Sequence, residues 1–357
     1  MISRRQLATL AAAAALAPRV ARAAPIPMRM GNAAGIVDPQ LSFATIGMHP
    51  KLGYYAAEGI ALEVINMSSS SQTMQALATG AVDFATINLL TYLPVVAKNP
   101  RLDLVSAYEW CQQAYWEVSV KPDSPIQSLK DLKGKKVGIR NTGDTGYFGA
   151  RAMLTELGLD PNNDCEWISV GDGGPAGDAL YRGRVDALAI WDGEDARIEI
   201  AGFKLRYLPS TPMTQKLFGA TYDVNRERLA SSRASFVGLF RAMAKSTIFV
   251  AANMELGIKL HWDLYPESKP KGIPEAQALA EMLTIVGRRA PKWFARADNP
   301  DQRMGATSLE AWKLSTQYTS MAAKIPDPSA LFTNELIDDV NRFNRDEVVA
   351  QAKTMKA

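Results

Sequence analysis

The chain has 357 residues, of which 22% are charged and 8% aromatic, with a formal net charge of +3 at pH 7. Residues 1–23 hold four arginines and no acidic residue, so the remainder has 36 basic residues against 37 acidic ones, a net charge of about −1. This balance gives no support to a nucleic-acid or membrane-surface partner. The two histidines, His49 and His261, lie far apart without cysteine partners, so no zinc site is expected.

The first 23 residues have the pattern of an export signal. Arg4 and Arg5 precede an alanine- and leucine-rich run, and Ala21-Arg22-Ala23 matches a small-x-small cleavage site. The order S-R-R-x-L favours the twin-arginine route, and a general secretory signal with two adjacent arginines is the alternative. The apolar run is too short for a retained membrane anchor. We therefore expect a soluble periplasmic protein.

The two cysteines, Cys111 and Cys165, leave two possibilities open. Neither lies in a lipoprotein pattern near the signal, so no lipid anchor is expected. Export would permit a disulfide between them, and two buried unpaired thiols are the alternative.

A short pattern occurs twice after the signal. ALATGAVDFATI at 76–87 and ALYRGRVDALAI at 179–190 share Ala, Leu, Gly, Val, Asp and Ile at matching positions 103 residues apart. Each copy is typical of a helix, a glycine that ends it and a short buried strand, because Gly80 and Gly183 tolerate the left-handed conformation. The length exceeds one comfortable core, so we expect two related α/β lobes.

Strands and helices alternate around both copies. The expected strands are near 28–34, 61–67, 82–87, 102–108, 136–140, 165–170, 185–191 and 204–208. The helices between them are expected at 40–56, 72–79, 89–98, 145–158, 175–182 and 193–201. Apolar residues then recur every three or four positions, which predicts four further helices at 234–254, 274–290, 308–325 and 334–353.

The alternation predicts open, mostly parallel sheets with a ligand site at the carboxyl ends of their strands. We expect the chain to cross between the lobes near 109–117 and 208–222. Residues 24–114 would then form the first part of lobe 1, residues 115–212 lobe 2, and residues 213–357 the rest of lobe 1 with the C-terminal helices.

The loop NTGDTGY at 141–147 precedes a helix, and free backbone amides at a helix start readily bind an anion or a carbonyl. Helix capping by Thr145 alone is the alternative. The loop lacks the lysine of a nucleotide phosphate loop, so phosphate transfer is not expected. The chain also lacks G-x-S-x-G, H-E-x-x-H and a Cys/His pair, so no catalytic residues are assigned.

Three segments together resemble a known family. They are KLGYYAAEGIALEVIN at 51–66, SSSSQTMQALATGAVDFATIN at 68–88 and SLKDLKGKKVGIRNTGDTGYFGARAMLTELGLDP at 128–161. In this order they resemble the extracytoplasmic solute-binding proteins of ABC importers, in the branch (NMT1/SsuA-like) with the sulfonate, taurine, nitrate and thiamine-pyrimidine binders. The resemblance covers nearly all of the chain after the signal.

The resemblance implies a type 2 periplasmic-binding-protein fold, an α/β fold with two doubly wound lobes and an interlobe cleft. It implies a monomer that closes on a small organic solute, without a cofactor or a metal. It also implies two partners, a membrane permease and its ATPase.

The resemblance places ligand loops at 68–72 and 141–147, on opposite sides of the cleft, and strand ends supply further candidates. The candidate ligand-binding residues are Asp38, Ser70, Ser71, Gln72, Asn88, Trp110, Tyr115, Asn141, Thr142, Asp144, Thr145, Tyr147, Trp191 and Asp192. Helix capping is the alternative for the serines, for Gln72 and for Asp192 with Glu194. Packing in the core is the alternative for the aromatic residues.

Charge in these loops bears on the solute. The loops carry no arginine or lysine, although Arg140 adjoins the second, and Asp38, Asp144, Asp192 and Glu194 offer carboxylates. Buried carboxylates need donors, which favours a nitrogen-bearing, aminopyrimidine-like solute. A sulfonate, a nitrate or an aromatic carboxylate held by helix amides is the alternative.

Two other functions share parts of this pattern. A sensor module that signals to a membrane protein without transport would carry every motif. A eukaryotic branch resembling this family makes thiamine pyrimidine with a histidine of its own chain and iron. Phe43 stands where that histidine would fall, and the cysteine-rich iron motif is absent, so we do not expect an enzyme.

Overall fold

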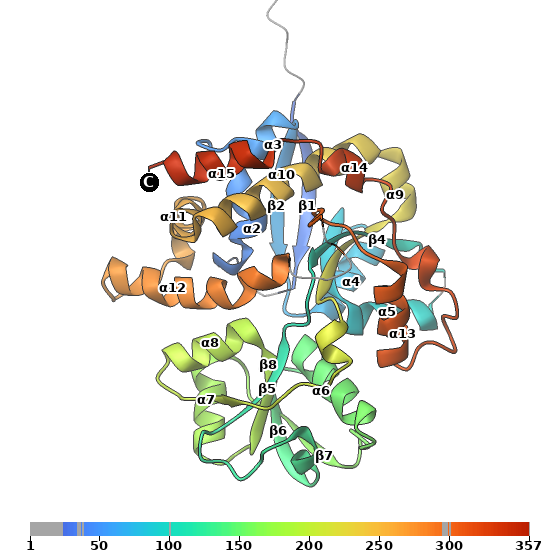
Figure 1. Ribbon diagram of the computed structural model, residues 1–357, viewed down its shortest axis with the longest axis vertical. Helices are drawn as coiled ribbons and strands as arrows, with labels where there is room; N and C mark the ends of the chain where they lie inside the picture. The colour runs from blue at the N-terminus through green and yellow to red at the C-terminus, as the bar shows by residue number, and fades with distance from the viewer. Residues whose placement is uncertain are drawn as a thin grey trace, which may run out of the picture.

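The structure is a computed structural model, and it describes residues 24–33, 37, 39–99, 101–294, 299 and 301–356. The predicted export signal and the candidate Asp38 lie outside the described residues. Two lobes are stacked along the long axis of the molecule, and each is built round a five-stranded sheet (Figure 1).

The sheet of lobe 1 has the strand order β2-β1-β3-β10-β4. Its strands are β1 (Ile26–Asn32), β2 (Ile60–Asn66), β3 (Phe84–Asn88), β4 (Leu104–Cys111) and β10 (Ala220–Asn225). β1 runs parallel to β2 and β3, whereas β10 runs antiparallel to β3 and β4. The last strand in sequence thus lies between two strands of the first part of the chain.

The sheet of lobe 2 has the order β7-β6-β8-β5-β9. Its strands are β5 (Trp116–Val120), β6 (Lys135–Ile139), β7 (Cys165–Ser169), β8 (Ala187–Trp191) and β9 (Arg206–Tyr207). β6 runs parallel to β7 and β8, and β5 runs antiparallel to β8 and β9. This arrangement repeats that of lobe 1, in keeping with the repeated sequence pattern.

In each sheet four of the five strands run in the same direction, so the expectation of mostly parallel sheets is confirmed, and one strand, β10 in lobe 1 or β5 in lobe 2, runs against the others. β5 and β10, which were not predicted, each follow a crossing from one lobe to the other. A strand that enters a lobe from the cleft runs away from it, whereas β1, β3, β6 and β8 end beside it. The direction of the crossing therefore makes these two strands antiparallel to their neighbours.

The helices of lobe 2 are α6 (Thr145–Glu156), α7 (Gly173–Tyr181) and α8 (Asp192–Ile200). The helices before and after the lobe 2 part of the chain are α2 (Ser42–Thr45), α3 (Tyr54–Ala57), α4 (Ser70–Ala78), α5 (Leu89–Lys98), α9 (Arg226–Ser231), α10 (Arg233–Ala252), α11 (Met254–Leu264), α12 (Glu275–Arg289), α13 (Leu309–Tyr318), α14 (Ile337–Val340) and α15 (Arg345–Thr354). Short 3-10 turns, among them η1 (Pro39–Leu41) and η6 (Ala290–Trp293), connect some of them.

Two helices predicted as continuous are broken. The segment 40–56 divides at His49, which is extended ahead of Pro50, and Gly53 has a φ of 59°. A residue before proline avoids the helical region, so the chain must turn there. The segment 334–353 divides into α14 and α15, and α15 begins at a new cap, where Asn344 accepts hydrogen bonds from the amides of Asp346 and Glu347.

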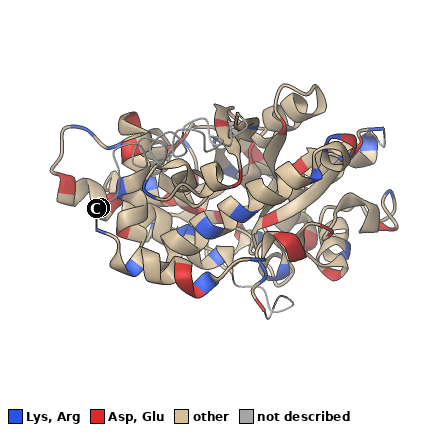
Figure 2. Cartoon of the chain, turned by 90° about the horizontal axis from the view of Figure 1, so that it is seen from above, with Lys and Arg blue, Asp and Glu red and all other residues tan. Residues whose placement is uncertain are grey.

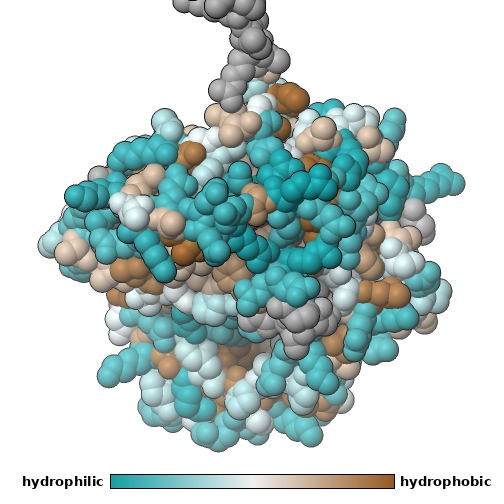
Figure 3. All heavy atoms as spheres, turned by 45° about the horizontal axis from the view of Figure 1, so that its top comes forward, coloured by the Kyte–Doolittle hydropathy of each residue, from teal (hydrophilic) through white to brown (hydrophobic). Residues whose placement is uncertain are grey.

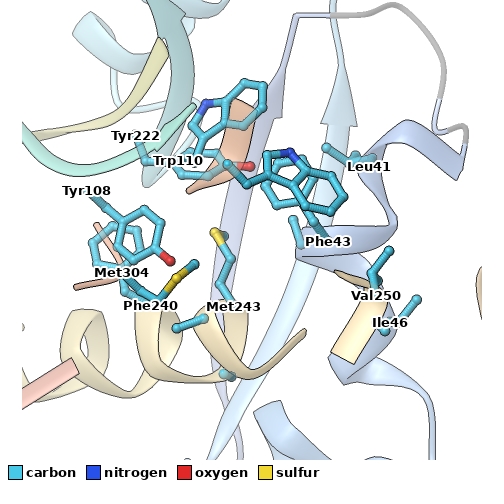
Figure 4. Packing of buried hydrophobic residues seen from close by; sticks show 14 of the residues in the cluster. Leu41, Phe43, Ile46, Tyr108, Trp110, Tyr222, Phe240, Met243, Val250 and Met304 are labelled. Carbon is cyan, nitrogen blue, oxygen red and sulfur yellow. The ribbon is translucent and has the colours of Figure 1, made fainter. Parts of the chain in front are cut away.

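Helix α10 is the centre of the core of lobe 1. The ring centroids of Phe240 and Tyr108 lie 4.9 Å apart, and Tyr222 packs beside them (Figure 4). Phe84 packs edge-on against Phe240. α10 is long and apolar enough to cross a membrane, but 72% of its most apolar window is buried inside the protein. A core helix has this pattern.

Cys111 and Cys165 are buried free thiols, so the disulfide that export would permit is not formed. Basic and acidic residues are interspersed along the chain (Figure 2). On the face shown in Figure 3, hydrophobic residues are scattered among hydrophilic ones.

Candidate functional site

A cavity of about 80 Å³ lies between the two lobes, and residues from both line it. The lining residues from the segments of lobe 1 are Asn32, Ala33, Gln40, Leu41, Phe43, Ser70, Thr86, Trp110, Tyr222 and Arg289. Those from lobe 2 are Tyr115, Asp144, Thr145 and Trp191. The cavity thus lies where β1 and β8 end and α4 and α6 begin, as expected for sheets of this type.

Aromatic rings form much of the wall on the side of lobe 1. Trp110, near the end of β4, stacks on Phe43 with ring centroids 4.8 Å apart and planes 15° from parallel. The indole Nε1 of Trp110 donates to Thr86 Oγ1 at 2.9 Å. This bond fixes the indole and satisfies its polar atom, so the ring presents an ordered surface to the cavity.

The wall from lobe 2 is organised by Asp144, the N-cap of α6. Its Oδ1 accepts a hydrogen bond from the amide of Gly146 at 3.1 Å, and Arg140 Nη1 donates to its Oδ2 at 3.5 Å. Burial raises the pKa of Asp144 to about 6, although the Gly146 amide and Arg140 lower it in part. Thr145 is thus the first residue of the helix and Asp144 its cap, so capping by Thr145 was wrong.

Gly146 is required where α6 meets β8. A Cβ at this position would overlap the backbone carbonyl of Ala189 and lie 2.5 Å from Ile190 Cα. The first turn of α6 can therefore approach the end of β8 only with glycine here. This close contact places Asp144 and Thr145 beside Trp191 in the cavity wall.

Arg289, at the end of α12, supplies a buried cation that the sequence analysis did not predict. Its Nε donates to both carboxylate oxygens of Asp192 at 3.0 Å, and its Nη2 also binds Asp192. Lys292 Nζ donates to Asp192 Oδ2 at 2.7 Å. Burial would raise the pKa of Asp192, but the two cations lower it to about 2. Asp192 is therefore ionised and neutralised within the protein.

The arginine also packs on aromatic rings. The guanidinium carbon of Arg289 lies 3.9 Å from the ring centroid of Tyr115 and 5.7 Å from that of Trp110. On the other side, Arg140 lies 5.0 Å from the ring centroid of Trp191. Each cation is thus held by a carboxylate and by an aromatic face, which fixes its position at the wall.

The structure brings six of the predicted residues to the cavity: Ser70, Trp110, Tyr115, Asp144, Thr145 and Trp191. Ser71, Gln72 and Thr142 are exposed and do not line it. Ser69, not Ser70, caps α4, and Gln72 accepts a hydrogen bond from the amide of Ser68.

Four other predicted residues are engaged elsewhere. Asn88 caps α5 and donates to the carbonyl of Gly219, and Asn141 accepts from the amide of Gly143. Tyr147 packs edge-on against Trp167. Asp192 neither lines the cavity nor caps α8 with its side chain, because it is paired with the two cations of the C-terminal segment.

The sequence analysis expected several carboxylates at the cleft, but the described ones do not gather there. Among the carboxylates that the structure describes, Asp144 alone lines the cavity. Glu194 pairs with Arg197 at 3.2 Å, and Asp195 accepts a hydrogen bond from Ser119 inside lobe 2. Within the described part of the chain, no three His, Cys, Asp or Glu side chains are placed to hold a metal ion.

Sequence reasoning missed several lining residues. Asn32 ends the first strand, so the rule that ligands lie at strand ends would have found it. Thr86 and Tyr222 lie within strands and carry no local signal, and Phe43 was considered only as the residue at the position of the enzymatic histidine. Arg289 stands in an ordinary helical pattern, and only the packing of α12 against lobe 2 brings it to the cavity.

Residues 40–255 match the profile of the family described as NMT1/THI5 like. The chain belongs to this family. The predicted NMT1/SsuA-like relationship is thereby confirmed, and a comparison with curated proteins gives no match.

Solved structures confirm the predicted periplasmic-binding-protein fold. The alkanesulfonate-binding protein SsuA from Xanthomonas axonopodis pv. citri, bound to MOPS, is 17% identical with a TM-score of 0.63, over 89% of this chain and 98% of that one. The aliphatic sulphonate-binding SsuA from Escherichia coli is 20% identical with a TM-score of 0.63, over 89% and 92%. A ligand-binding component of an ABC-type import system from Staphylococcus aureus, with zinc bound, is 12% identical with a TM-score of 0.62, over 89% and 99%.

Proposed function

We propose that this family member is the periplasmic solute-binding component of an ABC importer, and that it captures a small, planar, nitrogen-bearing solute between its lobes. The observation that carries the proposal is a cavity whose wall is completed by both lobes, with ring faces and paired charges around it. A solute in this position would contact both lobes at once and favour the closed form.

The size and the rings of the cavity favour a flat solute. Five of its lining residues are Phe43, Trp110, Tyr115, Trp191 and Tyr222. Aromatic faces stack on planar groups, and 80 Å³ is room for about six waters at 10–15 Å³ each. A single ring with short substituents fits this space better than a long chain.

The charges favour a neutral solute over a bare anion. Arg140 is paired with Asp144 and Asp172, and Arg289 is paired with Asp192. A sulfonate or a nitrate would compete with these carboxylates for the same cations. Amino or ring N–H groups would instead donate to Asp144 and leave both pairs intact, which avoids a buried unpaired charge.

The partners follow from the family and the predicted signal. Proteins of this fold include components of ABC import systems, and the predicted S-R-R-x-L signal would direct export. We propose a monomer that delivers its solute to a membrane permease and its ATPase. Its lobe 1 would comprise residues 24–114 and 213–357, and its lobe 2 residues 115–212.

A binding role, not a catalytic one, also agrees with Phe43, which stands where the thiamine-pyrimidine enzymes have their histidine. Phe43 is buried and stacked on Trp110, and a phenyl ring neither transfers a proton nor binds iron. A sensor module shares the same geometry. Uptake of the solute by vesicles that contain the permease and the ATPase, with and without this protein, distinguishes the importer from the sensor.

A thermal-shift screen of residues 24–357 tests the solute class. Aminopyrimidines, alkanesulfonates, nitrate and aromatic carboxylates are compared, and a ligand at 100 times its Kd stabilises the fold by about 2.7 kcal/mol. We expect aminopyrimidines to raise the melting temperature. Trp191→Leu should abolish this shift, whereas Trp167→Leu, which lies outside the cavity, should retain it. A shift with sulfonates or carboxylates alone would contradict the neutral solute. An undiminished shift in Trp191→Leu would contradict the location.

A further inference from the structure

Three cations of one short C-terminal segment face lobe 2. Arg288 and Arg289 end α12, and Lys292 lies in η6. α12 lies along α8 across the boundary between the lobes (Figure 1). The segment is therefore placed to join the lobes by charge.

Each cation reaches a carboxylate of lobe 2. Arg288 donates to Glu199 at 2.9 Å and to Glu117 at 3.0 Å. It also donates to the hydroxyl of Tyr207 at 2.6 Å, and its guanidinium lies 4.5 Å from the centroid of that ring. Lys292 lies 3.6 Å from Glu117, in addition to its bond to Asp192. Three cations and three carboxylates thus form one network.

The two sides of the network are fixed in different lobes. The apolar residues of α12, among them Met282, Ile285 and Val286, are buried in a cluster made mostly of lobe 1 residues, and α12 packs against α11 and η1 of that lobe. Glu117 lies on β5, and Asp192 and Glu199 lie on α8, all in lobe 2. Rotating the lobes apart would break every pair together, because no cation shares a lobe with its partners.

The geometry distinguishes this network from ordinary surface ion pairs. Isolated exposed pairs contribute little, whereas networks with ordered arginines contribute more. Arg288 is held by three acceptors and a ring face, and its side chain is 23% exposed. Asp192 is fully buried between Arg289 and Lys292.

The network also shares a wall with the solute cavity. Arg289 lines the cavity and packs on Tyr115, and Asp192 directly follows Trp191. Separating Arg289 from Asp192 therefore opens the cavity wall. One movement of the lobes therefore both breaks the ion network and opens the solute cavity.

We propose that Arg288, Arg289 and Lys292 form an ionic latch with Glu117, Asp192 and Glu199 that favours the closed form without solute, and so sets the affinity and the residence time of the solute. The effect on the solute rests on the function proposed above. The effect on the lobes does not, because it concerns the protein alone.

A distance measurement without solute tests the latch. Spin labels at Glu63→Cys on β2 and Glu166→Cys on β7 report the separation of the lobes, since both positions are exposed and the native cysteines are buried. We expect a dominant short distance in the otherwise unchanged protein and a shift to longer distances in Arg288→Gln. Arg288 does not line the solute cavity, so this variant leaves the solute contacts in place.

A matched control and a second variant complete the test. Arg182→Gln removes an exposed ion pair with Asp178 at the C-terminal end of α7, and it should leave the distances unchanged. Glu199→Gln should shift them as Arg288→Gln does. About 1 M salt, where the Debye length is about 3 Å, should lengthen the distances in the unsubstituted protein. Unchanged distances in both latch variants would overturn the proposal.

Affinity gives the second readout, with whichever solute the screen identifies. If the closed fraction falls from about nine-tenths to about one-tenth, the apparent Kd rises about ninefold, and we expect faster dissociation. An unaltered Kd and dissociation rate in Arg288→Gln would overturn the link to the solute. The distances report on the latch even if every solute in the screen fails, so the two proposals fail separately.

Discussion

At the residue scale, the folded environment of Asp144 changes the pH at which its carboxyl group ionises. Burial removes water from the carboxylate, and the Gly146 amide and Arg140 replace only part of that hydration. The folded pKa of about 6 thus exceeds the ordinary value of 3.8. The stability that the protonated form contributes is complete below pH 3.8 and is lost as the pH rises through 6.

Asp144→Asn should remove this pH dependence. Relative to the variant, the wild type should lose about 2–3 kcal/mol of unfolding free energy between about pH 4 and 7, at about 1.4 kcal/mol for each tenfold change in proton affinity. Urea unfolding across this range measures the difference. Asp338→Asn removes an exposed carboxylate of α14 that does not act on Asp144, so this variant is the control and should follow the wild-type profile. If the unfolding free energies of Asp144→Asn and the wild type differed by the same amount at every pH, the raised pKa of Asp144 would be contradicted.

At the scale of elements, α6 and α12 differ in how closely they approach their neighbours. Gly149 of α6 faces the indole of Trp116 on β5, so a Cβ there would overlap the ring. Gly287 of α12 has no atom within 4 Å of its Cβ position. One glycine is needed for packing, and the other only lowers helix stability.

The two alanine substitutions should therefore have opposite effects. Gly149→Ala should destabilise the protein by about 1–3 kcal/mol, because the core cannot accept the added methyl group without moving Trp116. Gly287→Ala should stabilise it by about 0.5–1 kcal/mol through helix propensity. Chemical denaturation of both variants measures the effects. Equal effects would show that α6 can move away from β5.

At the scale of the whole molecule, the two sheets differ in continuity. Every strand of lobe 2 comes from residues 116–207, whereas lobe 1 needs β10, at 220–225, between β3 and β4. Lobe 1 therefore cannot complete its sheet until the chain has passed through lobe 2 and returned. The core around α10 also depends on this return.

A fragment of residues 24–212 should lack a folded lobe 1. Without β10, β3 and β4 lose their common partner, and their buried side chains lose α10. Hydrogen exchange should show unprotected amides in β3 and β4 but protected ones in β6 and β8. Residues 115–212 alone serve as the control for lobe 2. Slow exchange in β3 and β4 of the longer fragment would contradict this dependence.

The sequence by itself determined the features that leave local signals. Apolar periodicity and helix-ending glycines indicated the repeated α/β units, and the starts of α4 and α6 indicated Ser70, Asp144 and Thr145, because strand ends and helix starts have local patterns. The resemblance of three ordered segments indicated the family and its fold.

Only the tertiary structure decided the partners of the charges and the direction of the crossing strands. Arg289 and Asp192 lie 97 residues apart, and nothing local to either residue marks the pair. β5 and β10 run antiparallel because the chain enters each lobe from the cleft. Such pairings depend on how distant segments meet in space, and the sequence pattern of one segment does not specify which other segment it will contact.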